Sequence, residues 1–276
     1  MPVEISDWND LDAVRNDLTG DYILVNGLDS ETAGYAGIGD DFEKFSASGF
    51  TEDPFSGTFD GDGFAIKDFV LGDYGGERGN ALFGGVGGGG LVENLTISGV
   101  VNVVGFSADG KYTGGLAGTV GASGTGTIQN CVAHVNVTSD DEEAGGLVGR
   151  NLGIVTDSYA TGAVEGDEDV GGLVGRSFED EIDSYWDTET TGQSTSDGDG
   201  IGLTTSEMQG SEAETNMSGF DFTNTWDVVL ESDNDTTADG YPILISPGRE
   251  SQLDAQGILS ELDPPEMPTN LEANLL

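Results

Sequence analysis

The sequence is poor in basic residues, in cysteine and in histidine. Its 276 residues include eight Lys and Arg, one Cys and one His, against 52 Asp and Glu, and the formal net charge is −44. Nucleic acids and anionic membranes are bound through clusters of Lys and Arg, so we expect neither as a partner. The single Cys131 cannot form a disulfide within the chain. Stability must therefore come from packing.

Long apolar runs are also missing. None approaches the roughly 20 residues of a membrane-spanning helix, so we expect no direct membrane insertion. The first residues, Met1 to Trp8, contain neither the basic region nor the apolar region of a secretory signal. We therefore expect no signal peptide in this chain, and a surface location would require a signal removed beforehand or another route out of the cell.

The excess of carboxylates indicates adaptation to high salt. In dilute buffer this charge would cause strong self-repulsion. At 1 M salt the Debye length falls to about 3 Å, and neighbouring carboxylates repel each other much less. Disorder is the alternative explanation, but 12 Phe, 7 Tyr and 3 Trp are too many for a disordered chain.

Glycine is abundant, with 46 residues, and disfavours long helices. Three Gly-Gly-Leu segments align without gaps, and Asn80 to Gly84 is a looser copy. The aligned segments are 114–118, 145–149 and 171–175. Such short repeats cannot bury an apolar face alone but can stack on their neighbours. The pattern predicts an all-β parallel solenoid with Leu116, Leu147 and Leu173 stacked inside it.

A strand-like run containing Asn or Asp follows each copy. These positions are Asp68, Asn94, Asn130, Asp157 and Asp183, at intervals of 26, 36, 27 and 26 residues. The longer interval is explained by an insertion around residues 121–126. Because stacked strands bring like residues about 4.8 Å apart, we expect these side chains to form a hydrogen-bonded ladder at the turns.

The chain divides into four parts. Residues 1–25 are predicted to form an N-terminal cap, with a short helix over 5–18, Ser6 as its N-cap and a first strand over 21–25. Residues 26–200 form the repeats, and 201–245 close the other end. Residues 246–276 form a Pro-bearing tail or linker, in which 263–268 is extended and Leu271, Leu275 and Leu276 could anchor a partner or belong to a disordered end.

The repeats resemble those of the bacterial and archaeal GLUG-repeat proteins. The resemblance rests on Gly145 to Asn151 with Asp157 to Gly162, on Asp183 to Gln193, and on Tyr241 to Leu244, and it spans roughly residues 3 to 245. It implies a right-handed parallel β-helix of the kind found in surface adhesins, to which residues 5–18 would add the short N-terminal capping helix predicted above. It implies no catalytic residues.

Several candidate sites have simpler explanations. Cys131 and His134 could suggest a nucleophile and its base, but their spacing along a strand sends them to opposite faces. Close carboxylate pairs could suggest a glycosidase, but 52 acidic residues produce such pairs by chance. The Gly-rich run 85–90 fits a turn better than a nucleotide loop.

Two further motifs concern ligands and modification. The segments 60–63 and 197–200, both Asp-Gly-Asp-Gly, could ligate Ca²⁺ or another cation, but neither has the bidentate Glu of an EF-hand loop, and turn chemistry with solvated charge is the favoured explanation. No other cofactor is expected. Four Asn-X-Ser/Thr sequons, at Asn94, Asn136, Asn216 and Asn234, would be glycan acceptors only in an exported chain.

The sequence favours a non-enzymatic structural or attachment protein. The preferred interpretation is a virion component of a halophilic archaeal virus, such as a tail fibre, spike or decoration protein. The alternatives are a haloarchaeal cell-surface adhesin module and, less favoured, a carbohydrate-active β-helix enzyme. Expected partners are other virion or cell-surface proteins, through the tail, and a host glycan or protein receptor; a homo-oligomer stays open. The expected location is the virion or extracellular surface.

Overall fold

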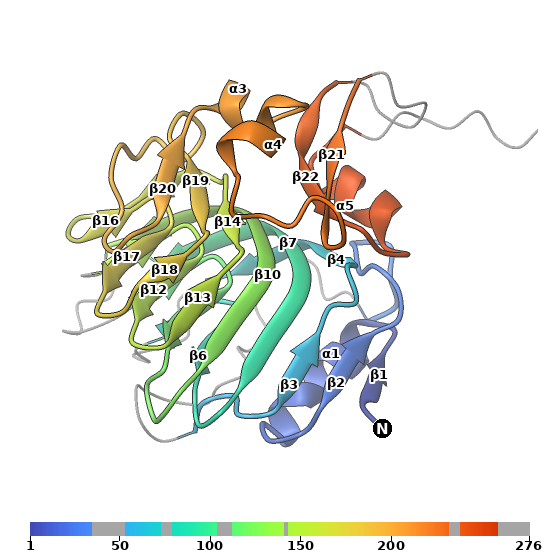
Figure 1. Ribbon diagram of the computed structural model, residues 1–276. Helices are drawn as coiled ribbons and strands as arrows, with labels where there is room; N and C mark the ends of the chain where they lie inside the picture. Colours follow the sequence, from blue (N-terminus) through green and yellow to red (C-terminus); the bar gives the residue numbers. More distant parts are fainter. Residues whose placement is uncertain (35–52, 73–78, 104–111, 141–142, 232–237, 259–276) are drawn as a thin grey trace, which may run out of the picture.

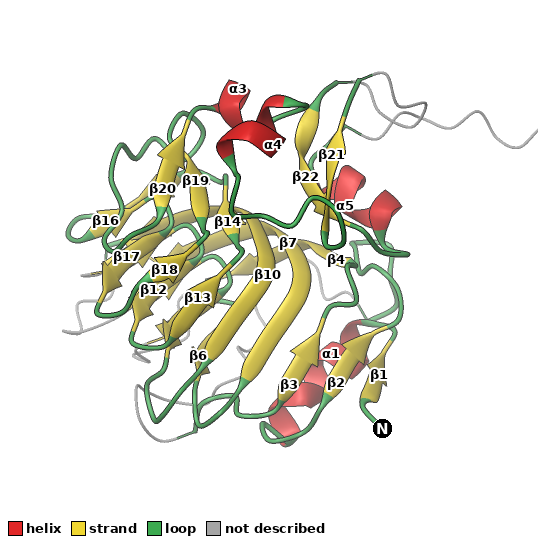
Figure 2. Ribbon diagram, viewed as in Figure 1, coloured by secondary structure: helices red, strands yellow, loops and turns green. Residues whose placement is uncertain are grey.

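The computed structural model describes residues 1–34, 53–72, 79–103, 112–140, 143–231 and 238–258. In this part of the chain the structure is all-β, with a few short helices (Figures 1 and 2). Three of its sheets are parallel, and a fourth is an antiparallel pair.

The first and largest sheet has twelve strands. They are β1 (Val3–Ile5), β2 (Tyr22–Leu24), β3 (Thr58–Asp60), β4 (Ala65–Leu71), β7 (Leu91–Val103), β10 (Thr127–Ser139), β13 (Ile154–Thr156), β14 (Tyr159–Ala160), β15 (Val164–Glu165), β18 (Glu181–Ile182), β19 (Tyr185–Asp187) and β20 (Ile201–Leu203). The second contains β5 (Gly79–Asn80), β8 (Tyr112–Gly114), β11 (Glu143–Gly145) and β16 (Val170–Gly171). The third contains β6 (Phe83–Val86), β9 (Ala117–Val120), β12 (Val148–Asn151) and β17 (Val174–Ser177).

The antiparallel pair and the helices complete the list. The pair is β21 (Trp226–Val229) with β22 (Gly240–Leu244). The helices are α1 (Trp8–Ala13), the 3₁₀ helix η1 (Val14–Asn16), α3 (Thr205–Met208), α4 (Glu212–Asn216) and α5 (Arg249–Ala255).

Successive repeats stack strand on strand. In the largest sheet, Thr127 faces Leu91 on one side and Ile154 on the other, which are the offsets of 36 and 27 residues expected from the sequence. In the second sheet Gly145 faces Gly114 and Gly171, and in the third Val148 faces Ala117 and Val174. The three Gly-Gly-Leu segments therefore lie one above another, between the second and third sheets.

The core follows the leucines of these segments. Leu116, Leu147 and Leu173 are fully buried. The backbone N–H of Leu116 donates to the carbonyl of Leu147 at 2.9 Å, and that of Leu147 donates to Leu173 at 2.9 Å. Trp186, stacked on Ala160, fills the core at its far end, where Gly172 leaves room for the indole.

The N-terminal part has a shorter helix than predicted. Ile5 belongs to strand β1, and helix α1 begins at Trp8 with Asp7 as its N-cap, because the Asp7 carboxylate accepts from the backbone N–H groups of Asn9 and Asp10. Ser6 instead donates its hydroxyl to Asp10. The helix still buries its apolar side, as the spacing predicts.

The C-terminal part lies elsewhere than predicted. Strand β20 extends the end of the largest sheet, but α3, α4, β21 and β22 cover the outer face of that sheet, the face opposite the leucine core (Figure 1). Apolar side chains of this C-terminal module, Phe220 and Trp226 among them, pack on Tyr159 and Tyr185 of the sheet.

The expected tail begins as an ordered element. Residues 249–255 form helix α5, which packs on β4, β7 and β22 and buries Gln252 and Leu253. The predicted extended segment 263–268 and the apolar residues Leu271, Leu275 and Leu276 lie outside the described residues.

Candidate functional site

A column of left-handed residues runs along one bend of the largest sheet. Asn94, Asn130, Asp157 and Asp183 have φ between 49° and 53°, a region that Asn and Asp tolerate better than most residues. The Asn130 Nδ2 donates to Asn94 Oδ1 at 3.1 Å. The Asn94 Nδ2 donates to Asp60 Oδ1, also at 3.1 Å. The structure thus brings four of the five predicted ladder positions together. The side-chain amides of Asn94 and Asn130 form hydrogen bonds along the column.

Asp68, the fifth predicted position, lies outside this column. It has φ 61°, but it sits in β4, where the register shifts between Ile66 and Phe69, and its carboxylate accepts from the backbone N–H of Ser30 at 3.1 Å. In the first repeat Asp60 faces Glu93, so Gly61 lies beside Asn94. A Cβ atom at Gly61 would collide with the Asn94 backbone.

The other two positions of the column, Asp157 and Asp183, carry carboxylates. The Thr156 hydroxyl donates to Asp157 Oδ2 at 2.7 Å. Burial and the charge of Asp183 raise the pKa of Asp157, against the effect of the Thr156 bond. Among the described residues, no three His, Cys, Asp or Glu side chains gather into a metal site.

One Asp-Gly-Asp-Gly segment makes a turn hydrogen bond, and the other makes a bond to the neighbouring repeat. Asp60 accepts from the N–H of Asp62 at 2.9 Å, and Asp197 accepts from the N–H of Ser177 at 2.9 Å. These bonds organise the backbone locally and link neighbouring repeats.

Cys131 and His134 point to opposite faces of β10. Cys131 belongs to the inner core, stacks on Ser158 and has a pKa raised to about 12 by burial. His134 lies on the outer face against Tyr159 and Tyr241. Its Nδ1 is 2.6 Å from the Thr161 hydroxyl, and its Nε2 is buried with no hydrogen-bond partner among the described residues. The two side chains cannot cooperate as nucleophile and base.

A buried carboxylate fixes the C-terminal module to the sheet. Asp187 is fully buried; its Oδ2 accepts from the hydroxyls of Tyr241 and Thr205, each at 2.6 Å, and its Oδ1 accepts from the N–H groups of Glu189 and Thr190. Tyr159 adds a bond from its hydroxyl to the Pro242 carbonyl at 2.7 Å.

An ion pair missed by the sequence reasoning lies between the second and third sheets. Glu143 is 1% exposed, and Arg150 donates to both of its carboxylate oxygens, with the Nε contact at 2.6 Å. The Arg150 guanidinium lies 3.8 Å from the centre of the Tyr112 ring. Arg176 stacks on Arg150 one repeat later. The signal was the Arg that follows Gly149 and again Gly175, in a chain with few basic residues.

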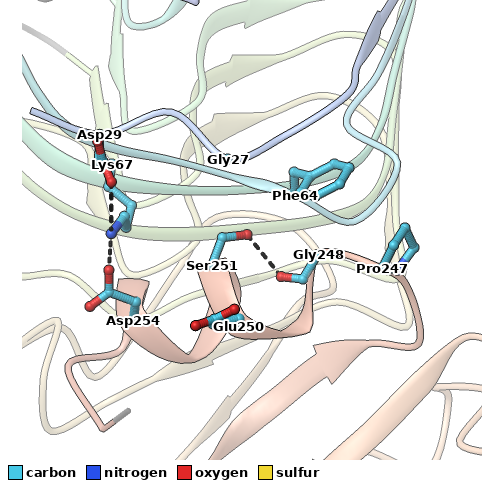
Figure 3. Close-up of a pocket in the computed structure, with 9 residues that line it drawn as sticks. All are labelled: Gly27, Asp29, Phe64, Lys67, Pro247, Gly248, Glu250, Ser251 and Asp254. Atoms are coloured by element: carbon cyan, nitrogen blue, oxygen red, sulfur yellow. Dashed lines mark hydrogen bonds and ion pairs between the residues drawn. The ribbon is translucent and has the colours of Figure 1, made fainter. Parts of the chain in front are cut away.

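Two surface hollows adjoin the C-terminal part. One, of about 310 Å³, separates α5 from β4; there Lys67 lies between Asp254 and Asp29, and Ser251 donates to the Gly248 carbonyl at 2.8 Å (Figure 3). The Ser251 bond lies within the start of the helix, whereas the pairing of Lys67 with Asp254 and a bond from the backbone N–H of Ala65 to the Ser251 hydroxyl, at 3.1 Å, hold α5 against the sheet.

The second hollow, of about 250 Å³, runs beside the left-handed column. It is lined by the Asn94 and Asn130 side chains on one side and by Asn224 and Ser246 on the other. Its lining includes one carboxylate, that of Asp62. A groove of this kind offers hydrogen-bonding groups to a polar ligand, but not the pair of carboxylates that a glycosidase uses.

One protein-family model matches part of the repeat region. The model for the GLUG motif matches residues 141–165. The chain contains a GLUG motif. In these residues the predicted resemblance is therefore confirmed.

No helix in the described ranges is long and apolar enough to span a membrane.

The chain is similar to Halomucin of Haloquadratum walsbyi, with 35% identity over 199 residues that cover 55% of this chain. It spans only 2% of the length of Halomucin. The two matches together support a GLUG-repeat protein of a halophile.

A solved structure also resembles the chain. It is that of a protein of Bacteroides ovatus, named as a candidate immunoglobulin A1 protease, with a TM-score of 0.54, 18% identity and coverage of 88% of this chain and 92% of the other. At this identity the likeness concerns the fold alone.

Proposed function

We propose that the chain is a non-enzymatic structural or attachment module at the extracellular surface of a halophilic archaeon. The observation that carries the proposal is the similarity to Halomucin of a halophile. Halomucin is many times longer than this chain. The net charge of −44 suits the same environment, because concentrated salt screens the repulsion between carboxylates.

The architecture we propose is a right-handed parallel β-helix. Three parallel sheets recur in the same order along the repeats, with the Gly-Gly-Leu segments stacked between two of them. About 98% of crossover connections between parallel strands of one sheet are right-handed, which supports this hand. A rod of this kind is a suitable spacer or binding surface, since its length grows with each repeat.

Three features support a non-enzymatic role. Cys131 is fully buried, and its pKa is raised to about 12. His134 lies on the other face of the same strand. The groove beside the left-handed column contains the one carboxylate of Asp62 among its lining residues. The neighbour named as a candidate protease shares only the fold, at 18% identity.

A virion protein is the other candidate from the sequence. The match to a cellular haloarchaeal protein favours the cell surface over the virus particle. Partners in either setting would be other surface proteins, a receptor glycan or protein, or further copies of the chain. Residues 263–276 are the candidate contact with such a partner.

Localisation tests the proposal. Antibodies against the chain, and mass spectrometry, would be applied to cytosol, washed envelopes, culture medium and purified virus particles from the source. The protein is expected in the envelope or the medium, together with a known surface protein used as a marker. Recovery from the cytosol alone would contradict the proposal, and enrichment in virus particles would establish the other candidate.

A further inference from the structure

We propose that Asn136 is an N-glycan acceptor, and that the fold selects it over the sequons at Asn94 and Asn216. The proposal rests on the extracellular location proposed above, since glycans reach such asparagines during or after export. The fourth sequon, at Asn234, lies outside the described residues.

Asn136 is placed as an acceptor must be. It lies in the long strand β10, is exposed, and shares a face of the strand with Thr138, because side chains two residues apart point the same way. The Asn136 Oδ1 accepts from the backbone N–H of Ala163 at 3.0 Å. That bond orients the carboxamide and uses its oxygen. Among the described residues, the Nδ2 atom has no hydrogen-bond partner.

The sequon at Asn94 is blocked at both ends. The Asn94 Nδ2 donates to Asp60 in the left-handed column, and the backbone there has φ 53°. The hydroxyl residue of the sequon, Thr96, is 2% exposed. A transferase would have to break the column and open the outer face to reach either group.

The sequon at Asn216 is blocked at its amide. Its Nδ2 donates to the carbonyls of Glu207 at 3.2 Å and of Glu212 at 3.0 Å, which ties helix α4 to helix α3. Ser218 is exposed, so the nitrogen is the protected group here.

The reaction at Asn136 is a glycosyl transfer from a lipid-linked glycosyl phosphate or diphosphate. The Nδ2 atom forms a bond to the anomeric carbon of the sugar and gives up one proton to a base of the transferase. The bond between the anomeric carbon and the phosphate oxygen breaks, and the lipid phosphate or diphosphate leaves with the electron pair. The Oδ1 bond to Ala163 does not need to break, because that oxygen takes no part in the new bond.

The test supplies export independently of the native location. The full chain, preceded by a secretory signal, would be produced in a halophilic archaeon that glycosylates its secreted proteins, and the secreted, folded protein would be digested and analysed by mass spectrometry. The peptide containing Asn136 is expected to carry glycan, whereas those containing Asn94 and Asn216 are expected to be unmodified. An unmodified Asn136, or equal occupancy at Asn94 or Asn216, would overturn the proposal.

Matched variants locate the modification. Asn136→Asp keeps the acceptor oxygen for Ala163 but removes the amide nitrogen, so it should lose the glycan and keep its circular dichroism spectrum. Thr138→Ala should lose the glycan and Thr138→Ser should retain it. Asn216→Asp is the control and should leave the glycan mass unchanged. Because the signal is added, a failure of native surface localisation and a failure of this site give different results.

Discussion

The hydroxyl of Tyr241 donates a 2.6 Å hydrogen bond to Asp187, a residue 54 positions earlier in the chain. Tyr241 belongs to the C-terminal module, and Asp187 ends a strand of the largest sheet. This buried bond joins two parts of the molecule whose proximity no local pattern in the sequence predicts.

Removing that hydroxyl should loosen the module. Tyr241→Phe is expected to lower the free energy of unfolding by about 1.5 to 3 kcal/mol, the range for a hydrogen bond to a charged group. The control is Tyr22→Phe, which loses a bond to the backbone carbonyl of Asp17 and should cost roughly 1 kcal/mol. Both losses of unfolding free energy would be measured by denaturant unfolding in high salt. Equal losses in the two variants would contradict a stronger hydrogen bond to Asp187.

The leucine stack should be highly sensitive to truncation. Leu147→Ala is expected to cost ~2 to 5 kcal/mol, because Leu147 is fully buried and its removal leaves a cavity. Ile182 is 55% exposed, and Ile182→Ala should cost less than about 1 kcal/mol. A loss below about 1 kcal/mol at Leu147 would contradict the observed stacking.

The left-handed column should reverse the usual ranking of alanine and glycine. Asn130 has φ 50°, so Asn130→Gly should be more stable than Asn130→Ala by roughly 1 kcal/mol. Gln129, the preceding residue of the same strand, offers the control, because glycine there should be the worse substitution. The same ranking at both positions would show that backbone conformation does not decide the outcome.

Stability should rise with salt. With a net charge of −44, the melting temperature followed by circular dichroism should increase between about 0.1 M and about 3 M KCl, as screening weakens repulsion between carboxylates. The control replaces KCl by an uncharged osmolyte at the same water activity. It measures the stabilisation that comes from exclusion of solutes from the protein surface rather than from charge screening. A melting temperature independent of KCl would refute adaptation to salt.

His134 should make the protein less stable in mild acid. Burial lowers its pKa from 6.5 to about 4, so between these values the unfolded chain binds a proton that the folded chain excludes. The stabilising contribution is therefore complete above pH 6.5 and is lost as the pH falls towards 4. The difference in unfolding free energy between wild type and His134→Gln should shrink by roughly 1 to 3 kcal/mol over this range.

Taking the difference in unfolding free energy between wild type and His134→Gln removes the pH dependence that other titratable groups contribute to both proteins. The raised pKa values of Asp157 and Glu181 act in the opposite direction, favouring the folded state at lower pH. A difference curve that stays flat between pH 4 and 6.5 would show that His134 is accessible to protons in the folded protein.

The repeats could be read from the sequence because each residue recurs in the same surroundings. Leu147 has leucines above and below it, so its burial follows from alignment alone. Asp68 shows where alignment misleads: it lies 26 residues before Asn94. Yet Gly61 occupies the corresponding position, because a register shift in β4 breaks the regular spacing.

The placement of the C-terminal module could not be read in the same way. Its apolar residues have to pack against another surface of the protein. The sequence suggested the end of the stacked repeats, whereas they pack on the outer face of the largest sheet. The outward-facing Tyr159 and Tyr185 of the sheet were the available signal, since an exposed face would carry polar residues there. Helix α5 was missed because Pro247 suggested an extended chain, whereas the helix begins two residues later, at Arg249, with Gly248 as its N-cap.

The return of the chain along the outer face has a mechanical consequence. Val25 bonds back to Ile5, and Gly27 lies against Ser251 of α5, so residues near the start of the chain and residues near 258 occupy the same end of the stack (Figure 1). A pull applied between these two points would act on the contacts of α5 with β4, β7 and β22 before it reached the stacked leucines. The stacked repeats would lie to one side of the line of tension, so α5 should separate from the sheet before the repeats are stretched.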